Sequence, residues 1–393
     1  MTLWERDQAY VLHTYSRTPI NFVRGDNATL WDDEGRDYID FTSGIAVTSV
    51  GHGNARLARA IAEQAASIIH ISNLYLIEPQ AKLAERLASL SGYPVRSFFA
   101  NSGAEANEGA IKIARKYGEV EGEPKRYKII TLKHSFHGRT ITTLKATGQE
   151  KMHNYFGPFP DGFVYASSIE EVENLLDDHT VAVMIELIQG EGGVEAMSKE
   201  AVQKLAKTLK ERDILLIIDE VQTGVWRTGE FLASNLYEIE PDVITLAKGL
   251  GGGVPIGAIM TRLVDIFLPG DHGSTFGGNY LSTRAALEVL DILEEEAERG
   301  AINEVIIRFE EELKKIVEVY PSLFNATSGL GLLRGLRCHD EEIVKKVITA
   351  AQAKGLLLLK AGRATVRIAP ALTISRAEID EGFKRLHAAL ASL

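Results

Sequence analysis

The chain has 393 residues, of which 45% are hydrophobic and 25% charged, and its formal net charge is −11 at pH 7. This composition is typical of a globular protein of two or three domains, and the acidic excess disfavours a nucleic-acid partner. The only cysteine, Cys338, excludes an intrachain disulfide and a metal site built from several thiolates.

The N-terminal region carries no targeting signal that we recognise. Residues 1–20 mix acids, bases and aromatics, and no window approaches the roughly 18 consecutive apolar residues of a membrane span. We therefore expect a cytoplasmic protein. Within 1–50 we expect a lead helix, followed by short strands at 22–26, 29–32 and 38–41 that charged hairpin turns separate.

Helical and strand-like patterns alternate along the middle of the chain. Helices are predicted around 61–65, at 80–90, at 104–117 and at 199–212, and short apolar runs lie at 97–100, 127–131, 182–185, 214–218 and 243–246. The runs are apolar throughout, as in strands buried on both faces of a mainly parallel sheet. This predicts an α/β fold with ligand chemistry at the carboxyl ends of the strands. A long helix at 281–299 leads into a second region of mixed helix and strand.

Lys248 follows the apolar run at 243–246 and precedes several glycines. A lysine next to a core is held there by a partner, or it has lost its proton and become a nucleophile. The position alone leaves both interpretations open.

Ser102 and Glu105 follow another apolar run and open a helix with the spacing of a capping box. The amides of this helix start could bind an anion such as a phosphate. A well-capped helix without a ligand is an equally good interpretation.

The segment after the run at 127–131 contains His134, Phe136, His137 and Arg139. The two histidines lack a third metal ligand, so we expect no metal site. An aromatic ring and an arginine suit a planar ring and a carboxylate better, although a structural loop explains the segment taken by itself.

Asp219 ends the buried run at 214–218 and needs a cationic or hydrogen-bonding partner. Without a ligand that partner would be an arginine, and with a cofactor it could be a protonated ring nitrogen. Ser274 and Thr275 lie in a loop that could contact phosphate, and Arg367, in an otherwise apolar strand, needs an anion opposite. A structural salt bridge is the usual explanation for such an arginine.

Together these residues form the inventory that pyridoxal phosphate requires. Lys248 would form the Schiff base, Asp219 would partner the pyridinium, and the arginines would bind substrate carboxylates. The combination also resembles the class III (subgroup II) aminotransferases of fold type I from end to end. The motifs that carry the resemblance lie at 22–25, 41–47, 101–107, 135–140, 189–193, 219–224, 246–249 and 274–279, and at Arg367.

The resemblance implies a fold and a domain division. We expect the fold type I of pyridoxal-phosphate-dependent transferases, with a mainly parallel seven-stranded sheet in a large domain and a smaller α+β domain. Residues 1–54 would be an N-terminal segment of the small domain, 55–280 the large cofactor-binding domain, and 281–393 the C-terminal small domain.

The resemblance also implies a role for each site residue. Lys248 holds the cofactor and moves a proton, and Asp219 keeps the ring nitrogen protonated. Cofactor contacts are expected from Ser102, Gly103, Ala104, Phe136, Gln222 and Thr275, the last of these across a homodimer interface. Substrate contacts are expected from Arg139, Glu191, Arg367, Ile45 and Ser274, with Arg139 binding the α-carboxylate of N-acetylornithine, Arg367 that of glutamate or 2-oxoglutarate, and Glu191 gating Arg367.

The implied reaction is ping-pong transamination between N2-acetylornithine and 2-oxoglutarate, which gives N-acetylglutamate 5-semialdehyde and glutamate and runs in reverse in arginine biosynthesis. Ornithine, succinyl-diaminopimelate and 4-aminobutyrate are alternative amino donors. Ile45, where ornithine-specific members typically carry a tyrosine, favours an uncharged acetyl group. Of the other classes, a nicotinamide dehydrogenase lacks its glycine pattern here, and a regulatory cofactor-binding protein would not need Arg139 and Arg367 together.

Overall fold

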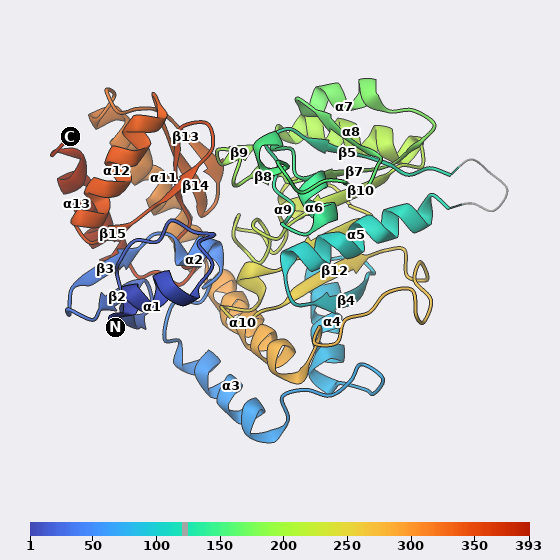
Figure 1. Cartoon of the computed structure of the whole chain (residues 1–393), viewed down its shortest axis with the longest axis horizontal. Helices are drawn as coiled ribbons and strands as arrows, with labels where there is room; N and C mark the ends of the chain where they lie inside the picture. Colours follow the sequence, from blue (N-terminus) through green and yellow to red (C-terminus); the bar gives the residue numbers. More distant parts are fainter. Residues whose placement is uncertain (120–124) are drawn as a thin grey trace.

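A central sheet of seven strands organises the computed structural model, which describes residues 1–119 and 125–393 (Figure 1). The strands are β4 (Arg96–Ala100), β5 (Lys128–Leu132), β6 (Phe163–Ala166), β7 (Thr180–Ile185), β10 (Leu215–Asp219), β11 (Val243–Leu246) and β12 (Gly257–Thr261). Their order is β4-β12-β11-β10-β7-β5-β6, and only β12 runs antiparallel to its neighbours. The predicted mainly parallel sheet is confirmed.

Both faces of this sheet are covered, which explains why its strands read as continuous apolar runs. Val183 and Leu216 pack with α7 (Ile169–Leu175) and α8 (Lys199–Glu211) on one face. Their neighbours Met184 and Leu215 pack with α5 (Gly103–Tyr117) on the other. Successive strand residues point to opposite faces, so a doubly buried strand must be apolar throughout.

The sequence pattern did not identify β6 and β12. Glycines obscure β12, because Gly257 opens it directly after the glycine-rich stretch that follows Lys248. Strand β6 is only four residues long and its two central residues are incompletely buried, so its apolar signal is weak.

The remaining strands form smaller sheets. One has the order β1 (Phe22–Asp26), β2 (Thr29–Asp32), β3 (Asp37–Asp40) and β15 (Leu356–Leu357), and another the order β13 (Phe324–Leu330), β14 (Leu333–Cys338), β17 (Thr365–Ile368) and β16 (Leu359–Ala361). A short hairpin pairs β8 (Ile188–Gln189) with β9 (Glu195–Ala196). Because β3 pairs with β15, the N-terminal strands lie beside the C-terminal elements in Figure 1. We propose from this pairing that residues 1–54 and 281–393 form one small domain against a large domain of 55–280.

Helices complete the fold. They are α1 (Leu3–Tyr10), α2 (Ser43–Ala46), α3 (Ala55–Ser67), α4 (Glu78–Ser91), α6 (Ile141–Ala146), α9 (Ala233–Leu236), α10 (Tyr280–Glu298), α11 (Ala301–Val319), α12 (Glu341–Ala353) and α13 (Arg376–Leu390), with 3-10 turns η1 (Glu150–Met152) and η2 (Lys248–Leu250). None of the helices in the described ranges has the length and hydropathy needed to cross a membrane.

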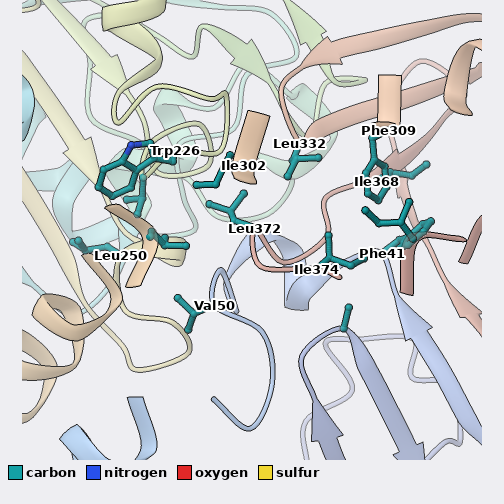
Figure 2. Packing of buried hydrophobic residues seen from close by; sticks show 14 of the residues in the cluster. Phe41, Val50, Trp226, Leu250, Ile302, Phe309, Leu332, Ile368, Leu372 and Ile374 are labelled. Atoms are coloured by element: carbon teal, nitrogen blue, oxygen red, sulfur yellow. The ribbon is translucent and has the colours of Figure 1, made fainter. Parts of the chain in front are cut away.

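The largest core cluster joins the N-terminal segment to the C-terminal elements (Figure 2). Phe41, after β3, packs against Phe309 of α11 and Phe383 of α13, with ring centroids 5.0 and 5.4 Å away, and these two rings also contact each other at 5.2 Å. Gly382 is required here, since a Cβ atom at this position would lie 2.2 Å from the Phe41 ring. This packing fixes the C-terminal strands relative to the loops that follow β3.

A single carboxylate ties the first hairpin to the last helix. Glu378 of α13 accepts hydrogen bonds from Asn27 Nδ2 at 2.7 Å, from the Ala28 amide at 2.8 Å and from Thr29 Oγ1 at 3.0 Å. It also accepts the Ser375 amide at the start of its own helix, at 2.9 Å.

We expect Glu378→Ala to lower the free energy of unfolding by about 2 kcal/mol, because it leaves these donors without their acceptor. Glu381→Ala on the same helix removes only partly exposed ion pairs with Lys384 and Arg385 and is the matched control, with an expected loss of roughly 0.5 kcal/mol. Denaturant unfolding of both variants measures the difference. Equal losses would mean that the Glu378 contacts add nothing specific.

Candidate active site

The carboxyl ends of the parallel strands surround a cavity of about 410 Å³. Eight of the predicted site residues line it, namely Ser102, Gly103, Ala104, Phe136, Arg139, Asp219, Gln222 and Lys248. They come from four segments, each of which follows a strand of the central sheet. Parallel strands deliver their carboxyl ends to one edge, which is how residues about 150 positions apart in sequence reach the same cavity.

Asp219, only 4% exposed, is held by hydrogen-bond donors and not by the arginine that the sequence suggested for a protein without a ligand. Its Oδ2 accepts Asn107 Nδ2 at 2.7 Å and His137 Nδ1 at 2.8 Å, and its Oδ1 accepts the Val221 amide at 3.1 Å. The predicted need for a hydrogen-bonding partner is met, but two of the donors come from a helix and a loop far away in the chain, which no local pattern identifies.

The two donors to Asp219 are themselves oriented. Asn107 accepts the Thr245 hydroxyl at 2.7 Å through Oδ1 and donates to the His137 carbonyl at 2.7 Å, so its amide has one defined orientation. His137 bonds to the carboxylate through Nδ1, and its buried Nε2 has no hydrogen-bond partner among the described residues.

Lys248 lies in the cavity wall at the end of β11, the strand next to the one that ends at Asp219. Burial, and next the positive charge of Arg367, lower the pKa of its amine to about 8, against opposing contributions from Glu191, Asp219 and Glu186. Its φ of 39° is unusual for a residue other than glycine and costs roughly 1–3 kcal/mol. Strained backbone of this kind is concentrated at functional sites.

The glycines after Lys248 mainly shape the turn. A Cβ atom on Gly251 would lie 2.0 Å from the Val254 carbonyl oxygen, and Gly252 has a φ of 58°. Of these glycines, Gly253 lines the cavity.

The helix start at Ser102 differs in detail from the predicted capping box. Ser102 Oγ accepts the Glu105 amide at 3.2 Å as expected, but the Glu105 carboxylate accepts the amide of Asn101, at 2.6 Å, instead of that of Ser102. A Cβ atom on Gly103 would lie 2.7 Å from Val221, so glycine is needed for this turn to approach the loop after Asp219. Ser102, Gly103 and Ala104 line the cavity at this helix start, where free amides can bind an anion.

Phe136 and Arg139 form a second wall. The Arg139 guanidinium lies 5.6 Å from the Phe136 ring centroid, and the Phe136 amide donates to Glu186 Oε2 at 2.9 Å. Burial and the neighbouring charge of Asp219 raise the pKa of Glu186 well above its usual value. His134, by contrast, is exposed while His137 is buried, so the two histidines do not act as a pair.

Arg367 and Glu191 lie beside the cavity, behind Gln222. Arg367 is 3% exposed, and its Nη1 donates to Glu191 Oε1 at 2.5 Å and to Gln222 Oε1 at 3.4 Å. A Cβ atom on Gly190 would lie 1.8 Å from Gln222 Oε1, so this glycine makes room for the contact. The anion that Arg367 was predicted to need is therefore Glu191.

Besides Arg367 and Glu191, three further predicted residues lie outside the cavity. Ile45 is 42% exposed with a φ of 69°. Ser274 accepts Asn101 Nδ2 at 3.2 Å, and together with the exposed Thr275 it lines two neighbouring surface hollows. Within one chain the site therefore lacks these contacts.

Sequence reasoning missed Asn107, Thr245 and Glu186 as individual site residues. Each is a polar residue at a position that the pattern makes buried: Asn107 on the covered face of α5, Thr245 inside β11, and Glu186 directly after β7. Glu186 carried the same signal as Asp219, an acid at the end of a buried strand.

The sequence and the fold are similar to those of several known proteins. The family model of class-III aminotransferases matches residues 10–390. Acetylornithine aminotransferase of Wolinella succinogenes is 64% identical over 385 residues, which is 98% of each chain. Two structures of ornithine aminotransferase from Toxoplasma gondii, both 31% identical and covering 99% of this chain and 94% of theirs, align with TM-scores of 0.93 and 0.91, and in the second pyridoxal phosphate partially occupies the active site. N-acetylornithine aminotransferase from Stenotrophomonas maltophilia is 34% identical over 96% of this chain and 97% of that one, with a TM-score of 0.80.

The charge of Arg367 should have a measurable effect on the pKa of the Lys248 amine. In the apoprotein we expect an amine-specific reagent to modify Lys248 half-maximally near pH 8. Mass spectrometry of the peptide that contains Lys248 measures the extent of modification at each pH. Arg367→Gln removes a cation and frees the Glu191 carboxylate. Both changes favour the charged amine, so the midpoint should rise by on the order of one pH unit. Arg337→Gln on β14, whose partner is Glu195 at 2.6 Å, is the control and should leave the midpoint unchanged. An unchanged midpoint in Arg367→Gln would contradict the electrostatic link.

Proposed function

The chain belongs to the class-III aminotransferases, and from this we propose that it transfers the δ-amino group of N2-acetylornithine to 2-oxoglutarate. The products are N-acetylglutamate 5-semialdehyde and glutamate, and in arginine biosynthesis the reaction runs in reverse. One observation carries the proposal of an aminotransferase: an amine with a pKa of about 8, that of Lys248, shares a cavity with Asp219. The 64% identity to an acetylornithine aminotransferase supports the choice of substrate.

Pyridoxal phosphate is the cofactor of this class, and when bound it supplies an electron sink for the charge left on a substrate carbon that loses its proton. The residues present fit it. The free helix start at Ser102, Gly103 and Ala104 suits the phosphate, Phe136 and the Asp219 carboxylate suit the ring and its nitrogen, and Gln222 suits the ring hydroxyl. Asp219 Oδ1 has a backbone amide as its hydrogen-bond donor, which leaves acceptor capacity toward the cavity.

Lys248 has two tasks in this proposal, to hold the cofactor and to move a proton. Its lowered pKa leaves a useful fraction of the amine unprotonated near neutral pH, as a nucleophile or base requires. Lys248 Nζ takes the proton from the substrate carbon that bears the amine. Asp219 acts at the other end of the ring, where its charge keeps the ring nitrogen protonated.

Each of two arginines binds the α-carboxylate of one of the two substrates. Acetylornithine reacts at its δ-amine and glutamate at its α-amine, so their α-carboxylates lie at different distances from the reacting carbon. Arg139 binds the carboxylate of acetylornithine, and Arg367 that of glutamate or 2-oxoglutarate. Glu191 neutralises Arg367 in the first half-reaction and releases it in the second, which their ion pair of 2.5 Å supports.

The site is completed by a second copy of the chain in this proposal. Thr275 and Ser274 lie outside the cavity of their own chain, and the side chains near them are exposed although apolar: Leu74 at 88%, Leu76 at 97% and Phe276 at 62%. A homodimer would cover these side chains and bring Thr275 to the phosphate of the neighbouring subunit. The apolar side chain of Ile45 would favour the uncharged acetyl group of acetylornithine over the free α-amine of ornithine.

Removing the amine of Lys248 tests the reaction. We expect the purified protein to show a visible absorbance band from bound pyridoxal phosphate that glutamate bleaches, and Lys248→Ala to lose this band as purified and at least about 10⁴-fold in kcat, since covalent and proton-transfer roles are lost together. Half-reaction rates with acetylornithine, ornithine, succinyl-diaminopimelate and 4-aminobutyrate identify the donor. A faster reaction with ornithine, as the likeness to the Toxoplasma structures would allow, would replace the substrate proposed.

The gate is tested by Glu191→Ala. With Arg367 unpaired in both half-reactions, acetylornithine can bind in the wrong register, so we expect its half-reaction to slow roughly tenfold relative to that of glutamate. Glu195→Ala, which breaks the pair with Arg337, serves as the control. If single-turnover rates with the two substrates kept their ratio in Glu191→Ala, Glu191 would not be a gate.

A further inference from the structure

Glu186 and Asp219 occupy equivalent places on neighbouring strands. Strand β7 pairs in parallel with β10, and Ile185 lies opposite Ile218. The next residue of each strand is the acid, so two carboxyl groups leave adjacent strand ends, which are about 5 Å apart, into the same cavity.

The two acids differ in the hydrogen-bond donors that they receive. Asp219 accepts bonds from Asn107, His137 and the Val221 amide. Glu186 is 5% exposed and accepts the Phe136 amide through Oε2. No arginine, lysine or histidine of the described ranges forms an ion pair with it, and its Oε1 has no protein partner there. Two negative charges on adjacent strand ends repel each other in a buried cavity, and the acid with fewer hydrogen-bond donors keeps its proton.

We propose that Glu186 is a positioning residue that works as a neutral carboxylic acid: it holds the backbone of Phe136 through Oε2 and leaves Asp219 as the charged acid of the pair. Burial and the charge of Asp219 both raise the pKa of Glu186, in agreement with the geometry. Among groups that face it, Lys248 opposes this effect and Glu191 adds to it, while His137 and Arg139 line the same cavity.

The neutral form has a consequence for Lys248. An ionised Glu186 would raise the pKa of the Lys248 amine, so a protonated Glu186 helps to keep that amine free of its proton. It would also add negative charge beside the anions that the cavity must admit. This consequence rests on the proposed function, whereas the protonation of Glu186 and its contact with Phe136 do not.

The test uses the apoprotein and Glu186→Gln, which keeps the shape of the side chain without an ionisable proton. A free glutamate in the unfolded chain loses its proton near pH 4.5, but the folded chain retains it, so the stability that Glu186 contributes falls as the pH rises toward its folded-state pKa. Glutamine does not titrate. The melting temperature of Glu186→Gln relative to wild type should therefore rise from pH 5 to pH 8, on the order of 2 °C per pH unit.

Glu211→Gln at the exposed end of α8 is the matched control, and its difference from wild type should stay constant over this range. A difference for Glu186→Gln that is constant or falls with pH would overturn the proposal. If melting is irreversible, the infrared difference spectrum between wild type and Glu186→Gln at pH 7 gives a second readout. We expect the C=O stretch of a protonated carboxyl group, and a carboxylate band in its place would overturn the proposal. Neither readout requires cofactor or turnover, so their failure is distinguishable from failure of the proposed transamination.

Discussion

The arrangement of this site depends on keeping the charge of Asp219 at the end of a buried strand. A carboxylate that is 4% exposed is stable only when donors replace its lost water, and Asn107, His137 and the Val221 amide supply them. Thr245 in turn orients Asn107. The donors come from α5, from the loop after β5 and from the loop after β10, so holding one charge fixes three segments around the cavity.

The same electrostatic logic extends to the other charged groups. Arg367 is as deeply buried as Asp219 and is paired with Glu191, and its charge lowers the pKa of Lys248. The amine therefore depends on β17, a strand of another sheet, as well as on its own. Because β17 is held by β14 and the aromatic packing around Phe41, the C-terminal elements take part in the chemistry of the cavity without lining it.

Much of this could be predicted from the sequence, and the failures have specific physical causes. The runs that became β4, β5, β7, β10 and β11 were recognisable because burial on both faces demands apolar residues throughout. Strand β12 was not, because glycines precede it and open it. The capping box at Ser102 was half right, since local spacing gives the serine bond but Glu105 bonds to Asn101 instead. The expectation that Asp219 needs a donor was met, but its donors are Asn107, His137 and the Val221 amide and not an arginine, because no local pattern reveals a donor that approaches from another element.

The sequence by itself determined the apolar strands, the acids and the lysine at their ends, and the order in which they occur, since these follow from local periodicity and residue chemistry. The tertiary structure decided which of them meet. It placed Asn107 and His137 on Asp219, paired Arg367 with Glu191, set Glu186 beside Asp219, and left Ile45, Ser274 and Thr275 outside the cavity. The physical reason is that pKa values, ion pairs and cavities depend on distances between residues far apart in the chain, which only the packing of strands and helices sets.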